Sequence, residues 1–265
     1  MKDMVKYAYG QFLAGVEEKM KRLLALLMCM FLFIGHAGAE RLPDDQLITY
    51  YDQAVFVGDS ISELFRFYVN GVVRKEHPDY FTGVKFYAAH GYKLATAAAP
   101  RPSHTETNIS YKGNAVSVRG LMERTQPGKV FILLGLGDRI GDDIDKGMEY
   151  VEAIVSTVAE VSPATKVHFF SLTPIDANVE KKAPNRQSKW DAYNVALEAK
   201  CKELGVYYIE IAAPLKDEKG LLAQSLATED GYHLNNDGNA IWVQMLLEFA
   251  QSQYDAGLWA PAEKE

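Results

Sequence analysis

The sequence predicts an α/β fold, with a doubly wound, mostly parallel sheet of five strands between layers of helices. Five short segments are apolar without alternation, as is typical of strands buried on both faces: residues 54–57, 84–89, 129–134, 167–172 and 206–211. Helical patterns follow these segments in turn, at residues 61–75, 116–124, 144–161, 188–204 and 239–254. Strands that alternate with helices form βαβ crossovers, and these build one parallel sheet.

The connections between these elements divide into short turns and two long segments. The first strand passes almost directly into the first helix, and Gly205 follows the fourth helix where a C-terminal capping glycine is expected. Residues 92–115 and 173–187 are long and polar, and both follow the carboxyl end of a strand. Doubly wound folds bind ligands at that edge, so we expect both segments to form walls of a substrate cleft. No repeat or linker interrupts residues 40–265, which predicts a single domain.

The first 39 residues have the three regions of a secretory signal peptide. Met20-Lys21-Arg22 is basic, residues 23–34 are all apolar, and Ala37-Gly38-Ala39 supplies small residues for cleavage after Ala39. Met20 is therefore the expected translation start. The apolar run of 12 residues is shorter than the ~20 that span a bilayer. We expect a secreted or periplasmic protein with no membrane span in the mature chain.

Charge and cysteine content exclude several functions. The leader has five basic and three acidic residues, so about −9 of formal charge remains on the mature part of a chain with net charge −7. An acidic protein without a basic cluster is not expected to bind nucleic acid. Cys201 is the only cysteine after the leader, which excludes an intramolecular disulfide and a Cys-based zinc site. His90 and His104 belong to no metal-spaced cluster, so we expect neither a metal nor another cofactor.

Ser60 is the candidate nucleophile. It ends Gly58-Asp59-Ser60, where an apolar strand runs into a helical pattern, and a helix start favours a developing oxyanion. The structural alternative is a helix N-cap, because Glu63 follows three residues later as in a capping box. Both roles are compatible with one serine.

His233 and Asp230 complete the set that serine hydrolysis requires. Imidazole takes the proton of the hydroxyl, and a carboxylate holds the imidazole in the correct tautomer. The alternative for Asp-x-x-His is a loop with an Asx-turn. Gly91 and Gly137 follow the second and third strands, where backbone N–H groups can approach an oxyanion closely. For Gly91, the alternative is an ordinary turn glycine.

These segments together resemble the sequence blocks of the SGNH/GDSL hydrolase family, in the same order and over most of the mature chain. The resemblance implies a flavodoxin-like three-layer α/β/α sandwich, with Ser60, Asp230 and His233 as catalytic residues and the amides of Ser60 and Gly91 at the oxyanion. The chain departs from the family at Gly137, where the third block normally has an asparagine whose side chain donates to the oxyanion.

Two residues beside Gly137 are further candidates. Arg139 is a possible substitute donor, or a solvent-exposed side chain, and Asp138 is a possible brace of the loop or the cleft.

The expected function is a secreted serine esterase. It would hydrolyse a small acyl ester, on a carbohydrate or cell-wall glycan, through an acyl-enzyme on Ser60. A glycan O-acetyltransferase with the same triad is one alternative, and a weakly active glycan-binding module that has lost its oxyanion donor is another. Oligomeric state is left open by the sequence.

Overall fold

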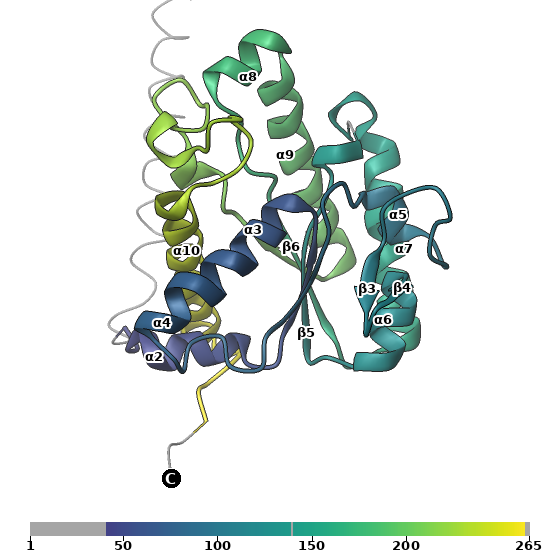
Figure 1. Cartoon of the computed structure of the whole chain (residues 1–265). Helices are drawn as coiled ribbons and strands as arrows, with labels where there is room; N and C mark the ends of the chain where they lie inside the picture. The colour runs from purple at the N-terminus through teal and green to yellow at the C-terminus, as the bar shows by residue number, and fades with distance from the viewer. Residues whose placement is uncertain (1–40, 139, 263–265) are drawn as a thin grey trace, which may run out of the picture. The chain divides into compact units, whose positions relative to one another are not determined.

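A five-stranded parallel sheet forms the centre of the protein in the computed structural model, which describes residues 41–138 and 140–262 (Figure 1). Every neighbouring pair of strands in this sheet is parallel. In spatial order the strands are β2 (Lys85–Ala88), β1 (Val55–Gly58), β5 (Lys129–Leu133), β6 (Lys166–Phe170) and β7 (Tyr207–Ile209). The predicted α/β class and five-stranded sheet are confirmed.

The strand order reverses direction between β1 and β5. From β1 the chain crosses outward to β2, then returns past β1 to β5 and continues to β6 and β7. Crossovers on the two sides of such a reversal leave opposite faces of the sheet, and ligands bind in the crevice between them. The carboxyl ends of β1 and β5 lie side by side there, with Gly58 paired in register with Leu133.

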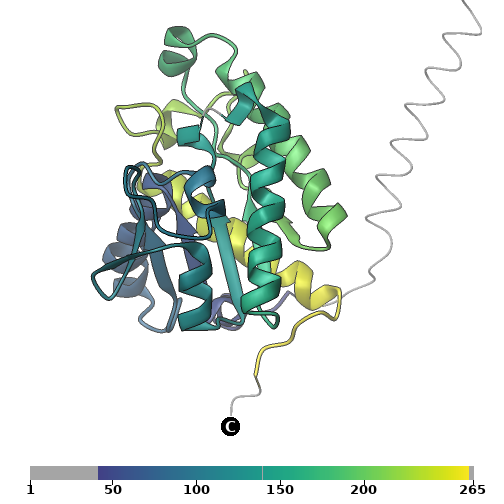
Figure 2. The same cartoon turned by 90° about the vertical axis from the view of Figure 1, so that its right-hand side faces the viewer.

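Helices cover both faces of the sheet (Figures 1 and 2). One face packs against α2 (Asp44–Leu47), α3 (Ser60–Tyr68) and α10 (Asn236–Asp255). The other face packs against α5 (Leu94–Ala98), α6 (Val118–Thr125), α7 (Ile144–Val161) and α9 (Arg186–Leu204). Residues Leu42–Glu265 form one compact unit. Among the described residues no helix is both long and apolar enough to cross a membrane.

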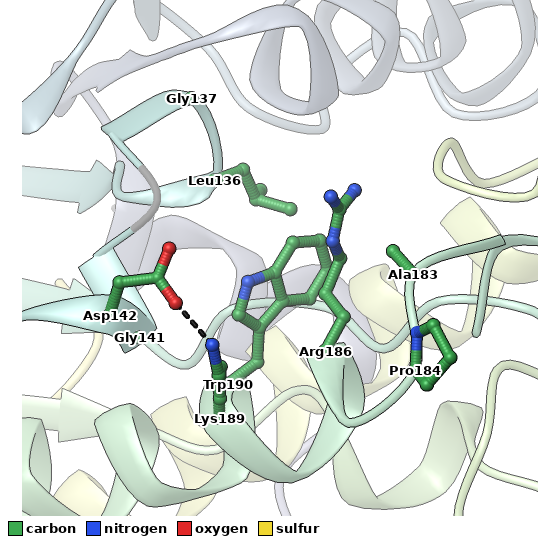
Figure 3. A pocket seen from close by; sticks show the side chains of 9 residues that line it. All are labelled: Leu136, Gly137, Gly141, Asp142, Ala183, Pro184, Arg186, Lys189 and Trp190. Carbon is green, nitrogen blue, oxygen red and sulfur yellow. Dashed lines mark hydrogen bonds and ion pairs between the residues drawn. The ribbon is translucent and has the colours of Figure 1, made fainter.

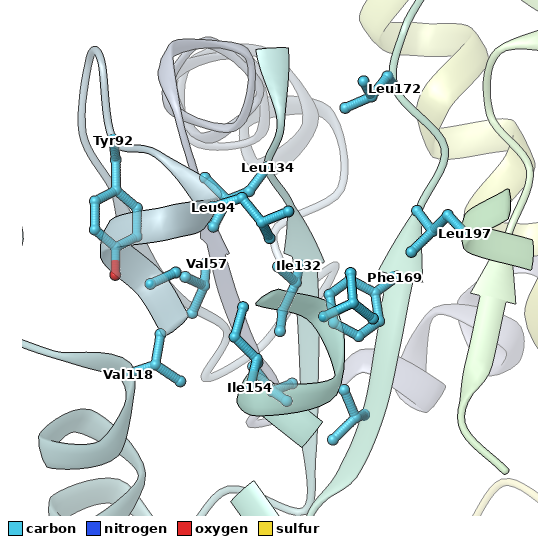
Figure 4. Close-up of a cluster of buried hydrophobic side chains, with 14 of the residues drawn as sticks. Val57, Tyr92, Leu94, Val118, Ile132, Leu134, Ile154, Phe169, Leu172 and Leu197 are labelled. Atoms are coloured by element: carbon cyan, nitrogen blue, oxygen red, sulfur yellow. The ribbon is translucent and has the colours of Figure 1, made fainter. Parts of the chain in front are cut away.

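One apolar core lies on each face of the sheet, between the strands and the helices that cover that face. Along β5, Val130 and Ile132 belong to one core while Phe131 and Leu133 belong to the other. Figure 4 shows Ile132 in the first of these cores, with Ile154 of α7 and Leu197 of α9 among its other members. Because successive strand residues point to opposite faces, a strand buried on both sides is mostly apolar along its whole length, with His168 of β6 as a buried exception. This explains why the strands were recognisable without alternation.

The two long connections contain short elements that the sequence did not reveal. The first connection, residues 92–115, contains α5 and most of an antiparallel hairpin of β3 (Ile109–Tyr111) and β4 (Asn114–Val116), which ends one residue beyond it. Within residues 173–187 lies α8 (Ala177–Lys182). Each is too short to show a hydrophobic period. The helix expected from residue 116 begins two residues later, because Val116 belongs to β4 and Ser117 caps α6.

The remaining helices agree with the sequence apart from their ends. The segment predicted as residues 61–75 is helical but not uniform: α3 is followed by a π-helical turn, η2 (Val69–Val73), and by α4 (Arg74–Glu76). Gly205 has a left-handed backbone with φ of 68° at the end of α9, as predicted. The predicted signal peptide lies outside the described residues.

Candidate active site

Ser60 lies at the carboxyl edge of the sheet, as the first residue of α3 and two residues after the end of β1. The N-cap of this helix is Asp59, whose Oδ1 accepts a hydrogen bond from the N–H of Ile61 at 3.0 Å. The capping-box interpretation of Ser60 was therefore wrong, and the Glu63 side chain instead contacts Arg66 at 3.3 Å. Because Asp59 caps the helix, the Ser60 hydroxyl remains available for another partner.

That partner is His233. Ser60 Oγ lies 2.8 Å from His233 Nε2, and His233 Nδ1 lies 2.6 Å from Asp230 Oδ2. If Nδ1–H donates to the carboxylate, Nε2 is left unprotonated and accepts from the Ser60 hydroxyl. Ser60 and His233 are 173 residues apart in sequence, so only the fold brings them together. The order hydroxyl, imidazole, carboxylate is the one found in serine hydrolases.

Asp230 organises the turn that carries His233. Its Oδ1 accepts hydrogen bonds from the N–H groups of Tyr232 at 2.8 Å and His233 at 3.0 Å, and from the Thr228 hydroxyl at 3.0 Å. Partial burial on its own would raise the pKa of Asp230, but these donors and the imidazole lower that pKa to about 2. The carboxylate therefore stays ionised over the whole range in which an imidazole titrates. The predicted Asx-turn and the proposed catalytic role coexist at this residue.

Asp138 ties the loop after β5 to the loop after β2. Its Oδ2 accepts from the N–H of Leu94 at 2.6 Å and its Oδ1 from the N–H of Ala95 at 3.0 Å. Both amides belong to the first turn of α5, which begins three residues after Gly91. Burial raises the pKa of Asp138, while these two amides act in the opposite direction. The contacts support a bracing role for Asp138 in holding the Gly91 segment.

The two oxyanion candidates differ in backbone conformation. Gly91 has φ of +74°, a left-handed conformation that favours glycine, whereas Gly137 is not among the residues with positive φ. A Cβ built at Gly137 would contact only Lys93 Cγ, at 3.7 Å, which is an ordinary van der Waals distance. Glycine is therefore not required by local geometry at residue 137. Arg139, the predicted substitute donor, lies outside the described residues.

Ser60, Gly91, Gly137 and His233 all line one small pocket of about 240 Å³. The same pocket is also lined by residues that the sequence did not single out or assigned elsewhere: Asp59, Ile61, His90, Tyr92, Leu136 and Tyr232. Tyr232 could have been found as the aromatic residue inside the Asp-x-x-His turn. His90 lies two residues after the end of β2.

Asp59 is a buried acid beside the nucleophile, with a side chain that is 4% exposed. Burial raises its pKa to about 7, the nearby charge of Asp138 adds to this, and the Ile61 N–H opposes it. The folded protein therefore holds a proton on Asp59 at pH values where the unfolded chain, with a pKa of about 3.9, has already lost it. By linkage, this residue makes the protein less stable as pH rises through that interval.

We expect Asp59→Asn to remove this pH dependence, because the amide does not ionise. The variant's free energy of unfolding, relative to the native protein, should increase by about 4 kcal/mol between pH 4 and pH 8. Urea unfolding of both proteins at a series of pH values measures the difference. If the free energies of unfolding of the two proteins change in parallel between pH 4 and pH 8, the raised pKa of Asp59 is contradicted.

No group of three or more His, Cys, Asp or Glu side chains among the described residues is arranged to hold a metal ion.

The fold and this constellation of side chains define an α/β protein of the serine hydrolase class. The model of the GDSL-like lipase/acylhydrolase family matches residues 56–241, and the chain belongs to this family. It is thus an SGNH-type hydrolase, as the sequence predicted. Among functionally curated proteins, none matches the sequence.

Several solved structures have a similar fold. A proposed acylhydrolase from Bacteroides fragilis has a TM-score of 0.57 at 14% identity, with 76% of this chain and 86% of that one covered. A GDSL-like lipase from Bacteroides thetaiotaomicron has a TM-score of 0.55 at 15% identity, covering 78% and 91%. A catalytic mutant of an acetylxylan esterase from Geobacillus stearothermophilus has a TM-score of 0.50 at 15% identity, covering 74% and 93%. At these identities the likeness concerns the fold.

Proposed function

We propose that the protein is a serine esterase that removes a small acyl group from a carbohydrate or cell-wall glycan through an acyl-enzyme on Ser60. The observation that carries the proposal is the continuous hydrogen-bonded relay from Ser60 Oγ through His233 to Asp230. Membership of an acylhydrolase family supports the same reaction class.

In the proposed mechanism His233 is first a general base and then a general acid. It takes the Ser60 proton as Oγ attacks the ester carbonyl, and the imidazolium that forms is stabilised by Asp230. The N–H groups of Ser60 and Gly91 are the donors proposed for the tetrahedral oxyanion. His233 then protonates the departing alcohol, and the acyl group stays on Oγ. Water activated by His233 attacks this acyl-enzyme and releases the acid.

Pocket size supports a short acyl chain. The pocket around Ser60 has a volume of about 240 Å³, below the ~300–1,000 Å³ of typical small-molecule sites. An acidic, exported protein is suited to polymers outside the cell, and one of the fold neighbours is described as an acetylxylan esterase. Both points support an acylated glycan as the natural substrate class.

Hydrolysis of p-nitrophenyl esters tests the proposal. We expect turnover of the acetate and butyrate esters, and at least ~10-fold lower kcat/KM for the decanoate, because the pocket leaves a long chain in water where its burial energy is lost. Ser60→Ala protein is the control for spontaneous and non-specific hydrolysis. An equal rate with the native and Ser60→Ala proteins would refute the esterase assignment.

Export is a separate part of the proposal. The basic, apolar and small-residue regions of residues 20–39 support cleavage after Ala39. N-terminal sequencing of protein recovered from the medium or periplasm should begin at Glu40. Membrane-bound material that begins at Met1 or Met20 would instead indicate an anchor.

A weakly active glycan-binding module is the second candidate, favoured by one observation. By its resemblance to the family's third sequence block, Gly137 corresponds to a position that normally has an asparagine donor to the oxyanion. The ester assay separates the two candidates, since a binding module would hold an acylated glycan without turnover. Adding a glycan acceptor to the same assay separates hydrolysis from O-acetyl transfer.

A further inference from the structure

A second, larger pocket adjoins the one that contains Ser60. It has a volume of about 500 Å³ and shares Leu136 and Gly137 with the catalytic pocket. Its other lining residues come from the turn before α7, the end of the α8–α9 connection and the first turn of α9: Gly141, Asp142, Ala183, Pro184, Arg186, Lys189 and Trp190 (Figure 3). A substrate whose ester carbonyl lies at Ser60 therefore has room on the other side of Leu136 and Gly137 for the remainder of the molecule.

The two cationic side chains described in this pocket, Lys189 and Arg186, differ in whether they form an ion pair. Lys189 forms an ion pair with Asp142 across the pocket. Arg186 is half-buried and, within the part of the chain that the structure describes, has no carboxylate at ion-pair distance. Figure 3 shows its side chain extending beside Trp190 toward Leu136. Among the described lining residues, Arg186 is thus a positive charge without an ion-pair partner, in a protein whose net charge is −7.

Arg186 is held in place by a residue of the catalytic turn. Its Nη1 donates to the hydroxyl of Tyr232, and its guanidinium lies 5.9 Å from the centre of the Tyr232 ring. Tyr232 lines the catalytic pocket and precedes His233 directly. A guanidinium has five N–H donors in a rigid fork, so the contact with Tyr232 leaves most of them available to a ligand.

We propose that Arg186 binds a carboxylate on the alcohol portion of the ester, so that the enzyme prefers acylated acidic sugars such as uronic acids over neutral ones. This inference rests on the proposed esterase function. The planar guanidinium matches a carboxylate with two parallel hydrogen bonds, a geometry that a hydroxyl group cannot reproduce. Tyr232 fixes the position of Arg186 relative to His233, and the shared residues Leu136 and Gly137 set the distance between ester and carboxylate.

The test compares 4-acetoxybenzoate with 4-acetoxybenzamide, two acetyl esters of similar size of which only the first has a carboxylate. We expect Arg186→Gln to reduce the ratio of their kcat/KM values about tenfold relative to the native protein, since a charge-assisted pair is replaced by a neutral one. The two esters differ in intrinsic reactivity, but this difference cancels when the ratio of their kcat/KM values is compared between variant and native protein. Lys182→Gln is the matched control, because it removes the same charge from α8 without lining either pocket.

Each outcome decides between alternatives. If Arg186→Gln lowers kcat/KM for both esters by the same factor, Arg186 only positions Tyr232 and the proposal is overturned. The proposal is also overturned if Lys182→Gln changes the ratio of the two kcat/KM values as much as Arg186→Gln does. Hydrolysis of neither ester by the native protein would count against the esterase function. The inference is then tested by calorimetric binding of 4-acetoxybenzoate to the Ser60→Ala protein, where Arg186→Gln should weaken binding about tenfold and unchanged binding refutes it.

Discussion

Replacing Ser60 with alanine is expected to lower kcat for short esters by at least ~10⁴-fold, and His233→Ala should have an effect of similar size. Without the Ser60 hydroxyl there is no nucleophile to form the acyl-enzyme. Without His233, the hydroxyl that now lies 2.8 Å from Nε2 loses its proton acceptor. Initial rates with p-nitrophenyl acetate measure both losses.

The double variant should be little worse than either single one. Triad residues act as a unit, so the second substitution removes a function that the first has already abolished. Losses that multiply would show that Ser60 and His233 contribute independently and would contradict the relay. Asp230→Asn should retain more activity than either, because it disturbs the orientation of His233 and leaves the nucleophile and base in place. Thermal melting of every variant checks that the fold is intact.

The sequence was sufficient for the layers of the fold because the three central strands are largely buried on both sides. Val130 and Phe131 face different cores, so neither position tolerates a polar residue, and β5 appears as an uninterrupted apolar run. Short elements such as α5 and α8 have no comparable pattern, since fewer than two turns cannot show a helical period. The sequence therefore predicts loops at these two places.

The sequence predicted the candidate catalytic residues of the site but not the contacts that depend on the fold. Ser60 lies at a junction between a strand and a helix and His233 lies just before a helix, which are places that sequence patterns locate, and the structure brings the two side chains to hydrogen-bond distance. Arg186 and Tyr232 could not be paired in this way, because their contact depends on where the α8–α9 connection lies over the sheet edge. The role of Asp59 as helix cap was also missed. Ser60 and Asp59 are both good N-caps, and only the backbone shows which residue starts the helix.

The substitution Gly137→Asn should increase turnover of short esters, by up to ~10²-fold. A side-chain donor at an oxyanion typically contributes about 2.7–4 kcal/mol to transition-state stabilisation, and we propose that Gly137 corresponds to the asparagine donor of related hydrolases. The structure offers no obstacle to the change. Gly137 is exposed, its φ is outside the left-handed region, and a Cβ would approach Lys93 Cγ only to 3.7 Å. Measured kcat with p-nitrophenyl acetate, native against variant, gives the gain.

Gly137→Ala is the control that separates the amide group from the loss of glycine. We expect it to leave both kcat and the melting temperature close to the native values, because alanine adds the same Cβ without a donor. If asparagine gives no gain while alanine is neutral, another group already supplies the missing hydrogen bond, and Arg139→Ala becomes the informative variant. If the gain appears, the native enzyme lacks one oxyanion donor that an asparagine side chain at residue 137 supplies. In that case Ser60, His233 and Asp230 are already positioned for efficient catalysis.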